Sequence, residues 1–359
     1  MEKVMFLTNH SYMFYQFRRE LAQDLLQDYE VVISTPFNGR EDDLRDMGCK
    51  VIETKFERRG ISPTGELELY RTYLRLLKEE QPDFVITYSI KPNVYGGRAC
   101  QKLGIPYAVN VQGMGTAFEK PGLRQVASTL YREGCKGARV VFFENKSDAE
   151  YFTDHKIIRQ DLAFVLPGAG VNTTYYAYSP LEDHDKFHFL YLGRIMKEKG
   201  IDELFEAMRR IHEEYPDTVL DIVGFTEEDY ESKINQLVND GIAVFHGFHR
   251  DPRPFYVSAD CVVLPSYHEG MSNVLLEAAS TGRLLITTNI PGCKEAVDLG
   301  KTGYLVKPKD SDSLYRMMRK ALSLPREERE QISHKAREKM EYEFAKEEVV
   351  KLTRNACRI

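Results

Sequence analysis

The chain alternates short β-branched runs with stretches of ten or more residues of helical pattern. In the first half the runs occupy 4–8, 31–35, 50–54, 83–89, 107–111 and 140–145, and in the second half 189–193, 220–224, 244–247, 261–266, 284–288 and 303–306. Continuous apolar runs separated by helices indicate parallel strands that are buried on both faces and joined by right-handed crossovers. The sequence therefore predicts an α/β fold of two doubly wound, Rossmann-like domains facing across a cleft.

The alternation is interrupted at 166–176, where Pro167, Gly168 and Gly170 lie close together. A chain of 359 residues also exceeds the size at which a single core keeps growing. We predict an N-terminal domain over 1–170 and a C-terminal domain over 171–335. The last helix, about 336–359, has no strand of its own to cover, so we expect it to pack back on the first domain.

Composition excludes several classes of protein. Residues 1–172 carry 23 basic and 23 acidic side chains, and the remainder carries the net charge of −6; a nucleic-acid-binding protein would usually show a basic domain. No apolar stretch is long enough to span a membrane, and the start has no signal-peptide shape. The six cysteines are scattered without a Cys-x-x-Cys pair. We therefore expect reduced thiols in the cytoplasm, no metal site and no nucleic-acid partner.

The segment YLGRIMKEKGIDELFEAM (191–208) places two cations between a strand and a helix. The strand ends at Gly193, Arg194 and Lys199 flank the loop, and the helix begins near residue 201. Arginine binds phosphate as a planar fork, lysine acts as a point charge, and a helix N-terminus adds unpaired N–H groups. The loop suits a diphosphate, and surface cations on a turn are an equally good interpretation of this segment alone.

A second informative segment, YHEGMSNVLLEA (267–278), holds two glutamates that lie eight residues apart. Glu269 follows a strand and a Pro-Ser turn, and Gly270 allows a ligand to approach the backbone closely. The next residues, Met271, Ser272 and Asn273, expose N–H groups in the first turn of a helix. Sugar hydroxyls at Glu269 and a diphosphate on these amides would satisfy both sets of groups.

Glu277 falls about five residues into the same helix, among apolar neighbours. A carboxylate in such a place needs hydrogen-bond donors, and the two hydroxyls of a ribose would supply them. The alternative is a capped helix with Glu277 in a surface salt bridge.

Together these segments resemble the paired motifs of the retaining glycosyltransferases of family four, which have the GT-B fold. GRIMKEKG (193–200) resembles the family's Gly-Arg…Lys-Gly loop, and EGMSNVLLE (269–277) resembles its Glu-x7-Glu motif. The likeness runs over nearly the whole chain and is strongest in 166–310. It implies that the catalytic residues are Arg194 and Lys199, on the donor diphosphate, and Glu269, on the sugar hydroxyls.

The resemblance also implies the remaining contacts of the donor. Glu277 would hold the ribose, and Phe248, in HGFHR (246–250), would contact the base. The other donor-binding residues that it implies are Gly193, Gly270, Met271, Ser272 and Asn273. The donor is then a UDP-sugar, and the resemblance implies that the diphosphate needs no metal or other cofactor.

The first half departs from many members of the family. It lacks the common Gly-Gly after the first strand and the His-x-His after the fourth, and has instead TNHSYMFYQFRREL (8–21) and TYSIKPNVYG (87–96). Both pieces, with NVQGMGTAFEKPG (110–122), resemble the subgroup that builds lipid-linked oligosaccharides for capsule, O-antigen or glycoprotein glycans. The acceptor would then be a polyprenyl-diphosphate-linked saccharide, with Lys91 on its phosphate. The other residues expected on the acceptor side are Asn9, His10, Gln112 and Gly113.

Residues 122–134 carry a narrow apolar stripe of Leu123, Val126, Ala127 and Leu130, and 102–139 contain six Lys or Arg against two Glu. A basic amphipathic helix can lie in an anionic bilayer surface. We therefore expect a cytoplasmic protein with a peripheral contact to the inner membrane surface. A helix that covers its own sheet is an equally good interpretation.

These observations predict transfer of a hexose or N-acetylhexosamine from a UDP-sugar to the lipid-linked saccharide, with retention of configuration. One alternative is a UDP-sugar 2-epimerase of the same fold, which would need acid and base carboxylates facing the sugar ring and lacks this pair of motifs. The other is a non-catalytic nucleotide-sugar or glycan-binding module, against which the complete donor set argues.

Overall fold

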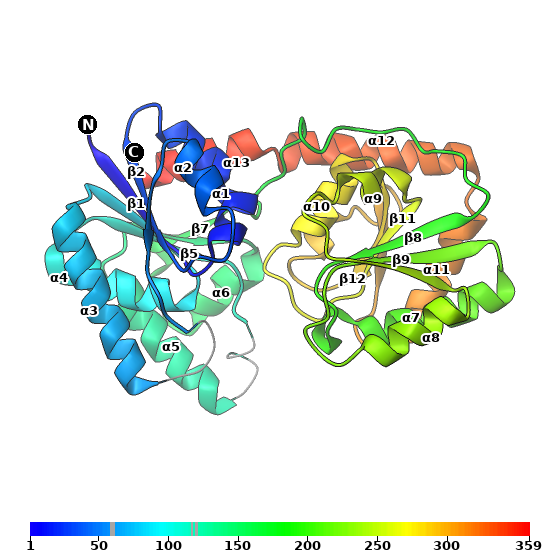
Figure 1. Ribbon diagram of the computed structural model, residues 1–359, viewed down its shortest axis with the longest axis horizontal. Helices are drawn as coiled ribbons and strands as arrows, with labels where there is room; N and C mark the ends of the chain where they lie inside the picture. Colours follow the sequence, from blue (N-terminus) through cyan, green and yellow to red (C-terminus); the bar gives the residue numbers. More distant parts are fainter. Residues whose placement is uncertain (58–61, 116–117, 119–120) are drawn as a thin grey trace. The chain divides into compact units, whose positions relative to one another are not determined.

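The structure is a computed structural model that describes residues 1–57, 62–115, 118 and 121–359. The chain forms two compact units, Met1–Ala169 with Glu347–Ile359, and Gly170–Lys346. Each unit has a parallel sheet with helices on both faces (Figure 1). The predicted class, α/β with two doubly wound sheets, is confirmed.

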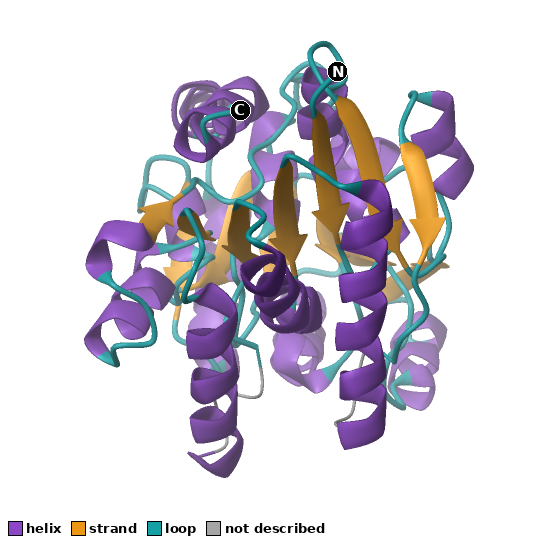
Figure 2. Ribbon diagram, turned by 90° about the vertical axis from the view of Figure 1, so that its left-hand side faces the viewer, coloured by secondary structure: helices purple, strands orange, loops and turns teal. Residues whose placement is uncertain are grey.

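The first unit contains a seven-stranded parallel sheet with the order β3-β2-β1-β4-β5-β6-β7, whose strands run in the same direction (Figure 2). The strands are β1 (Lys3–Leu7), β2 (Glu30–Thr35), β3 (Lys50–Glu53), β4 (Phe84–Tyr88), β5 (Tyr107–Val111), β6 (Val140–Phe143) and β7 (Ala163–Val165). Six of them coincide with predicted runs. The sequence analysis missed β7, because three partly exposed residues are too few to show a pattern.

Helices cover both faces of this sheet, and each face has its own apolar core. One core lies under α1 (Ser11–Leu25), α2 (Glu41–Asp46) and α13 (Lys346–Cys357). The other lies under α3 (Pro63–Glu80), the π-helix η1 (Pro92–Gly96), α4 (Gly97–Leu103), α5 (Pro121–Cys135) and α6 (Lys146–Asp154). A short 3-10 helix, η3 (Gln160–Leu162), precedes β7. The strands are apolar on both faces because both are covered.

The second unit contains a six-stranded parallel sheet with the order β10-β9-β8-β11-β12-β13. Its strands, all of them predicted, are β8 (Phe187–Leu192), β9 (Thr218–Val223), β10 (Ala243–Gly247), β11 (Cys261–Leu264), β12 (Leu284–Thr288) and β13 (Gly303–Val306). One face carries α7 (Ile201–Glu214), α8 (Glu231–Asn239) and α11 (Ser311–Ser323), and the other carries α9 (Arg253–Ser258), α10 (Asn273–Ser280) and α12 (Arg326–Glu343) (Figure 1). The 3-10 helices η4 (Lys197–Lys199) and η5 (Lys294–Ala296) lie in loops.

The end of the chain differs from the single helix predicted over about 336–359. Ala345 breaks the helix by pairing with Val171. The Val171 N–H donates to the Phe344 carbonyl at 2.8 Å, and the Lys346 N–H donates to the Val171 carbonyl at 3.0 Å. These bonds keep α12 in the second unit. The prediction that the chain packs on the first domain from about residue 336 onward was therefore wrong for residues 336–346.

Only Glu347–Ile359 joins the first unit. There the Arg354 guanidinium donates to Asp24 at 2.8 Å and to Asp28 at 2.7 Å, at the end of α1. Arg139 also donates to the Cys357 carbonyl at 2.6 Å. These contacts fix α13 against the first sheet.

Both strand orders reverse at one place, between β1 and β4 in the first unit and between β8 and β11 in the second. Ligands of doubly wound sheets bind outside the carboxyl ends of the strands at such a switch point. The relevant loops are those that follow β1 and β4, and those that follow β8 and β11. The predicted cations and Glu269 lie in the second pair.

Candidate active site

The loop 193–200 leads from β8 to α7 and carries both predicted cations. Gly193 has a φ of 151°, and a Cβ on Gly224 would lie 1.8 Å from the Gly193 carbonyl oxygen. The ends of β8 and β9 therefore approach each other more closely than a side chain at position 224 would allow. The Tyr191 hydroxyl then fixes the start of the loop by donating to the Arg194 carbonyl at 2.6 Å.

Arg194 is half-buried, and its Nη1 lies 2.6 Å from Oε2 of Glu227. The neighbouring backbone is paired as well, because the Ile195 N–H donates to the Phe225 carbonyl at 2.9 Å. Among the residues that the structure describes, no other side chain or carbonyl accepts from the Arg194 guanidinium. One edge of the guanidinium is therefore fixed, and the rest of its donors suit a phosphate. Glu227 was not predicted, since it belongs to no recognisable motif.

Lys199 contacts the second loop directly. Its Nζ lies 2.5 Å from Oε1 of Glu269, and the two side chains are only 15% and 14% exposed. The Ser266 hydroxyl donates to the same oxygen at 2.7 Å. Within the described residues no hydrogen-bond partner occupies Oε2 of Glu269, which can therefore accept from a sugar hydroxyl.

The two loops also touch through their backbones. Gly200 has a φ of 70°, and a Cβ there would lie 2.2 Å from the Pro265 carbonyl oxygen. The Tyr267 N–H donates to the Glu198 carbonyl at 2.9 Å, and its hydroxyl donates to Glu203 at 2.7 Å, in the first turn of α7. Arg194, Lys199 and Glu269 are thus held in one place by loops from adjacent strands.

The backbone before α10 is shaped by Gly292, whose φ is 83°. A Cβ on Gly292 would lie 2.5 Å from the Gly270 carbonyl oxygen, and the Ser272 N–H donates to the Gly292 carbonyl at 2.8 Å. The expectation that the Ser272 amide faces a phosphate is therefore wrong, because a backbone carbonyl already uses it. The N–H groups of Met271 and Asn273 have no such partner in the described part of the chain.

Glu277 is the fifth residue of α10 and is 7% exposed. The Tyr256 hydroxyl donates to its Oε2 at 2.8 Å. Burial, and then the charge of Glu277, raises the pKa of Tyr256 well above its usual value, so this hydroxyl remains a donor. The burial of Glu277 excludes the surface salt bridge that was the alternative interpretation. No sequence motif pointed to Tyr256.

Phe248 follows β10 and is 52% exposed. Its ring centroid lies 6.2 Å from that of Phe225, another exposed ring. The preceding strand, β10, is held by the Asp221 carboxylate of β9. This carboxylate lies 2.7 Å from Nε2 of His246 and 2.7 Å from Nδ1 of His188. Burial opposes ionisation of Asp221, but hydrogen bonds to both imidazoles outweigh it and lower its pKa.

With this geometry established, two sequence families cover most of the chain. Residues 177–339 match the glycosyl transferases of group 1, and residues 3–145 match the family described as glycosyl transferase 4-like. The chain belongs to the family-four glycosyltransferases.

Two relatives of this glycosyltransferase are informative. The N,N'-diacetylbacillosaminyl-diphospho-undecaprenol alpha-1,3-N-acetylgalactosaminyltransferase of Campylobacter jejuni is 26% identical over 331 residues, or 87% of each chain. The UDP-Gal:alpha-D-GlcNAc-diphosphoundecaprenol alpha-1,3-galactosyltransferase of Escherichia coli is 28% identical over 275 residues, which cover 71% of this chain and 70% of that one. The crystal structure of HepE from Anabaena in complex with UDP and glucose has 17% identity and a TM-score of 0.83, and covers 100% of both chains. This last likeness supports the GT-B fold class.

In the first unit, the predicted acceptor residues of the glycosyltransferase lie in the loops after β1, β4 and β5. Lys91 is paired with a carboxylate, because its Nζ lies 2.9 Å from Oε1 of Glu66. His10 precedes α1, and Gly113 has a φ of 130°. Asn9 and Gln112 contact the same unpredicted residue, Ser89. Part of the segment 110–122, at 116–117 and 119–120, lies outside the described residues.

The apolar stripe of α5 divides between two environments. Ala127 is buried with Tyr131 in the core under the helix, whereas Leu123 is 41% and Val126 is 47% exposed. One side of this helix therefore covers its own sheet, and another side presents apolar side chains to solvent. The membrane contact stays a prediction. Throughout the described ranges, no helix is long and apolar enough to cross a bilayer.

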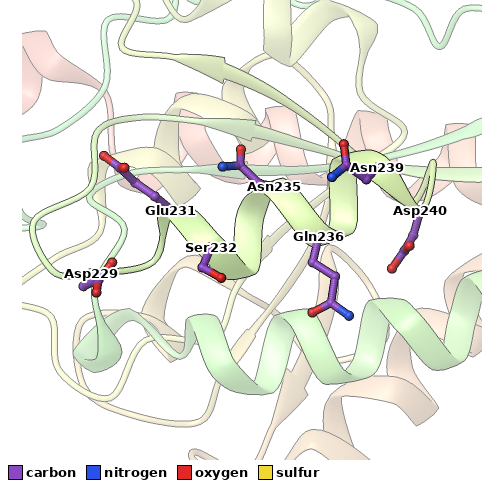
Figure 3. A pocket seen from close by; sticks show the side chains of 7 residues that line it. All are labelled: Asp229, Glu231, Ser232, Asn235, Gln236, Asn239 and Asp240. Atoms are coloured by element: carbon purple, nitrogen blue, oxygen red, sulfur yellow. The ribbon is translucent and has the colours of Figure 1, made fainter.

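Figure 3 shows a pocket along α8 that contains none of the predicted site residues. It is lined by Asp229, Glu231, Ser232, Asn235, Gln236, Asn239 and Asp240. Three carboxylates without a cation do not suit a diphosphate, so we do not assign the donor to this pocket. Outside the masked positions, no three His, Cys, Asp or Glu side chains are grouped to hold a metal ion.

Proposed function

We propose that this glycosyltransferase moves a hexose or N-acetylhexosamine from a UDP-sugar to a saccharide linked to polyprenyl diphosphate, with retention of the anomeric configuration. The observation that carries the proposal is the contact between Lys199 and Glu269 at the switch point of the second sheet. A cation and a carboxylate within one hydrogen bond of each other match the diphosphate and hydroxyls of a nucleotide sugar.

The comparisons support the two substrates. Both relatives described above are named for acceptors that carry diphospho-undecaprenol, and one is named for UDP-galactose. HepE, which has a similar fold, was crystallised with UDP and glucose. A lipid-linked acceptor and a UDP-linked donor are therefore the first substrates to test.

The chemical step requires stabilisation of the charge that builds on the departing diphosphate as the glycosidic bond stretches. Arg194 and Lys199 are each fixed by a carboxylate, and the N–H groups of Met271 and Asn273 have no backbone partner among the described residues. All four donors lie in or directly after the loops that follow the adjacent strands β8 and β11. Fixed donors aimed at a developing charge lower the barrier without reorganisation during the reaction. Oε2 of Glu269, which has no hydrogen-bond partner among the described residues, orients the sugar by accepting from a hydroxyl.

Because two cations and backbone amides supply positive charge at the diphosphate, we propose that turnover needs no divalent metal. Enzyme treated with a chelator and then assayed in metal-free buffer should retain its full rate. Loss of activity that added Mg²⁺ or Mn²⁺ restores would contradict this part of the proposal.

The function is tested by screening UDP-sugars for UDP release with a short-chain polyprenyl-diphosphate-linked sugar as acceptor. We expect one donor to give acceptor-dependent UDP release and a product whose new linkage has the same anomeric configuration as the donor, as measured by proton NMR. Conversion of a UDP-sugar without UDP release would show an epimerase instead. Absence of turnover with every donor, combined with UDP binding, would indicate a binding module.

We further propose that the enzyme works at the cytoplasmic face of the inner membrane and touches it through α5. Leu123 and Val126 are exposed on this helix beside Arg124, also exposed, so the surface combines apolar and basic groups. Such a surface binds anionic bilayers. Sedimentation with phosphatidylglycerol vesicles should fall for the Leu123→Ser, Val126→Ser variant. The control Val238→Ser, at an exposed valine of α8, should bind as the original protein does.

A further inference from the structure

Ser89 has an unusual backbone conformation for a residue with a side chain, because its φ is 75°. The other non-glycine residues with positive φ in the described part of the chain flank helix ends or lie in turns: Arg40, Gln81, Lys156, Lys309 and Arg358. Ser89 also precedes a helical segment, which begins at residue 90, but it follows β4 directly and so lies at the switch point of the first sheet. Residues with side chains rarely adopt this conformation, and where they do the strain is frequently part of a functional site.

The surroundings of Ser89 explain how the conformation is held. Its carbonyl accepts from the Asn93 N–H at 2.9 Å, next to the π-helix η1. Its hydroxyl donates to Oδ1 of Asn9 at 2.9 Å and lies 3.3 Å from Oε1 of Gln112. Asn9 follows β1 and Gln112 follows β5, so one serine connects three adjacent loops.

This connection leaves both amide groups ready for a ligand. Ser89 contacts the oxygen atoms of Asn9 and Gln112, and within the described residues no hydrogen-bond partner takes their NH₂ groups. All three side chains are at least partly exposed. Lys91, two residues beyond Ser89, is bound to Glu66. Neutral amide donors without an available cation suit sugar hydroxyls better than phosphate.

We propose that Ser89 is a positioning residue that holds Asn9 and Gln112 against a sugar ring of the acceptor saccharide at the switch point of the first unit. The inference rests on the proposed function and names the acceptor subsite within it. Ser89 acts through the two amides, which make the hydrogen bonds to the sugar. Its strained backbone aims the hydroxyl at both of them.

The test compares Ser89→Gly with Ser89→Ala. Both remove the hydroxyl, but glycine also removes the conformational strain. We expect the KM for a short-chain polyprenyl-diphosphate-linked saccharide to rise about tenfold in both variants, the effect of losing about one hydrogen bond. The KM for the UDP-sugar and kcat at saturating acceptor should stay near their original values. A Ser89→Gly variant with the original acceptor KM would overturn the proposal, because it would show a purely structural role.

A matched control is Gln81→Gly, at the C-terminal end of α3, where φ is 47° and the side chain is exposed. It relieves the same kind of strain away from the switch point, so thermal stability should be kept or increased and the acceptor KM should not change. The double variant Asn9→Ala, Ser89→Gly should have an acceptor KM no higher than that of the single variant with the higher KM. Full additivity would contradict a shared subsite.

Binding without turnover separates this inference from the proposed function. Saturation-transfer NMR with the same acceptor and no donor should show contact to a sugar ring in the original protein and a weakened signal in Ser89→Gly. If the original protein releases UDP with this acceptor but the Ser89 variants change only the donor KM, the subsite assignment fails and the function stands. If the original protein neither binds the acceptor nor releases UDP, the proposed function fails with it.

Discussion

Lys199 and Glu269 form an ion pair at 2.5 Å although 70 residues separate them in the chain. They lie in the loops that follow β8 and β11, the two strands on either side of the switch point in the second sheet. The pair and the backbone contacts around it fix both loops before any ligand arrives. A bound diphosphate then meets donors that are already in place, which lowers the reorganisation needed for catalysis.

Lys199→Ala should lower kcat/KM by about 10²–10³, or roughly 3–4 kcal/mol of transition-state stabilisation, because it removes a fixed cation at the leaving group. Initial rates of UDP release measure this effect. The control is Lys197→Ala, an exposed lysine in the same short helix, which should have a nearly normal rate. A folded Lys199→Ala variant with normal turnover would refute the assigned role.

Tyr256→Phe should lower thermal stability, because the buried carboxylate of Glu277 loses the hydrogen bond from the Tyr256 hydroxyl. A hydrogen bond to a charged group contributes about 1.5–3 kcal/mol. We also expect a higher KM for the donor, since Glu277 is then less firmly oriented toward the ribose. Melting curves and donor titrations measure the two effects, and Tyr342→Phe, at a 92% exposed tyrosine, is the matched control. Unchanged melting of Tyr256→Phe would show that the bond has no stabilising effect.

Gly292→Ala should displace the backbone of Glu269 and Gly270, because the new Cβ would lie 2.6 and 2.5 Å from their carbonyl oxygens. The control Gly300→Ala has a similar φ of 74° and no atom within 4 Å of the new Cβ. It should cost only the conformational penalty, about 1–2 kcal/mol. Activity should therefore fall much further in Gly292→Ala than in Gly300→Ala. Equal activities in the two variants would contradict the close approach.

The hydrogen bond to Asp221 raises the pKa of His188 above its usual 6.5, against the opposing effect of burial. The folded state therefore holds the proton more tightly than the unfolded state. This contribution to stability is full below pH 6.5 and is lost as pH rises through the raised folded-state pKa. The melting temperature of the original protein, relative to His188→Gln, should fall between about pH 6 and pH 8.

The control for this pH effect is His155→Gln, because the ring of His155 lies at the Tyr151 carbonyl rather than at a carboxylate. This variant removes an imidazole without removing a contact to a carboxylate, so it controls for the loss of a histidine as such. If the melting temperature of His188→Gln changed with pH in the same way as that of the original protein, the contact between His188 and Asp221 would not stabilise the fold.

Local pattern was enough to predict twelve strands, because strands buried on both faces are continuously apolar. It also placed Arg194, Lys199 and Glu269 in loops at carboxyl ends, which follows from the strand boundaries alone. The break at Ala345 was not predictable, because it depends on pairing with Val171, far away in the sequence.

The residues that the sequence analysis missed share this dependence on tertiary contacts. Glu227, Tyr256 and Ser89 become important only through the side chains that the fold brings to them. The incorrect expectation for the Ser272 amide has the same origin. The residues around Ser272 do not predict that its N–H donates to the carbonyl of Gly292, twenty residues later in the chain. Helix N-terminal amides are free by default, and only the complete fold shows which of them are taken.

Each cation of the donor site is paired with a carboxylate: Arg194 with Glu227, and Lys199 with Glu269. Both contacts are therefore electrically neutral when no substrate is bound. Inorganic phosphate that displaced the carboxylates would leave Glu269 without its cation and without hydroxyls to replace it. A nucleotide sugar brings the anion and the hydroxyls in one molecule, so it can use the remaining donors of Lys199 and the second oxygen of Glu269 without separating the pair. Inorganic phosphate should consequently bind weakly to the enzyme. It should therefore be a weak competitor of the nucleotide sugar, even though the loop 193–200 carries two lysines.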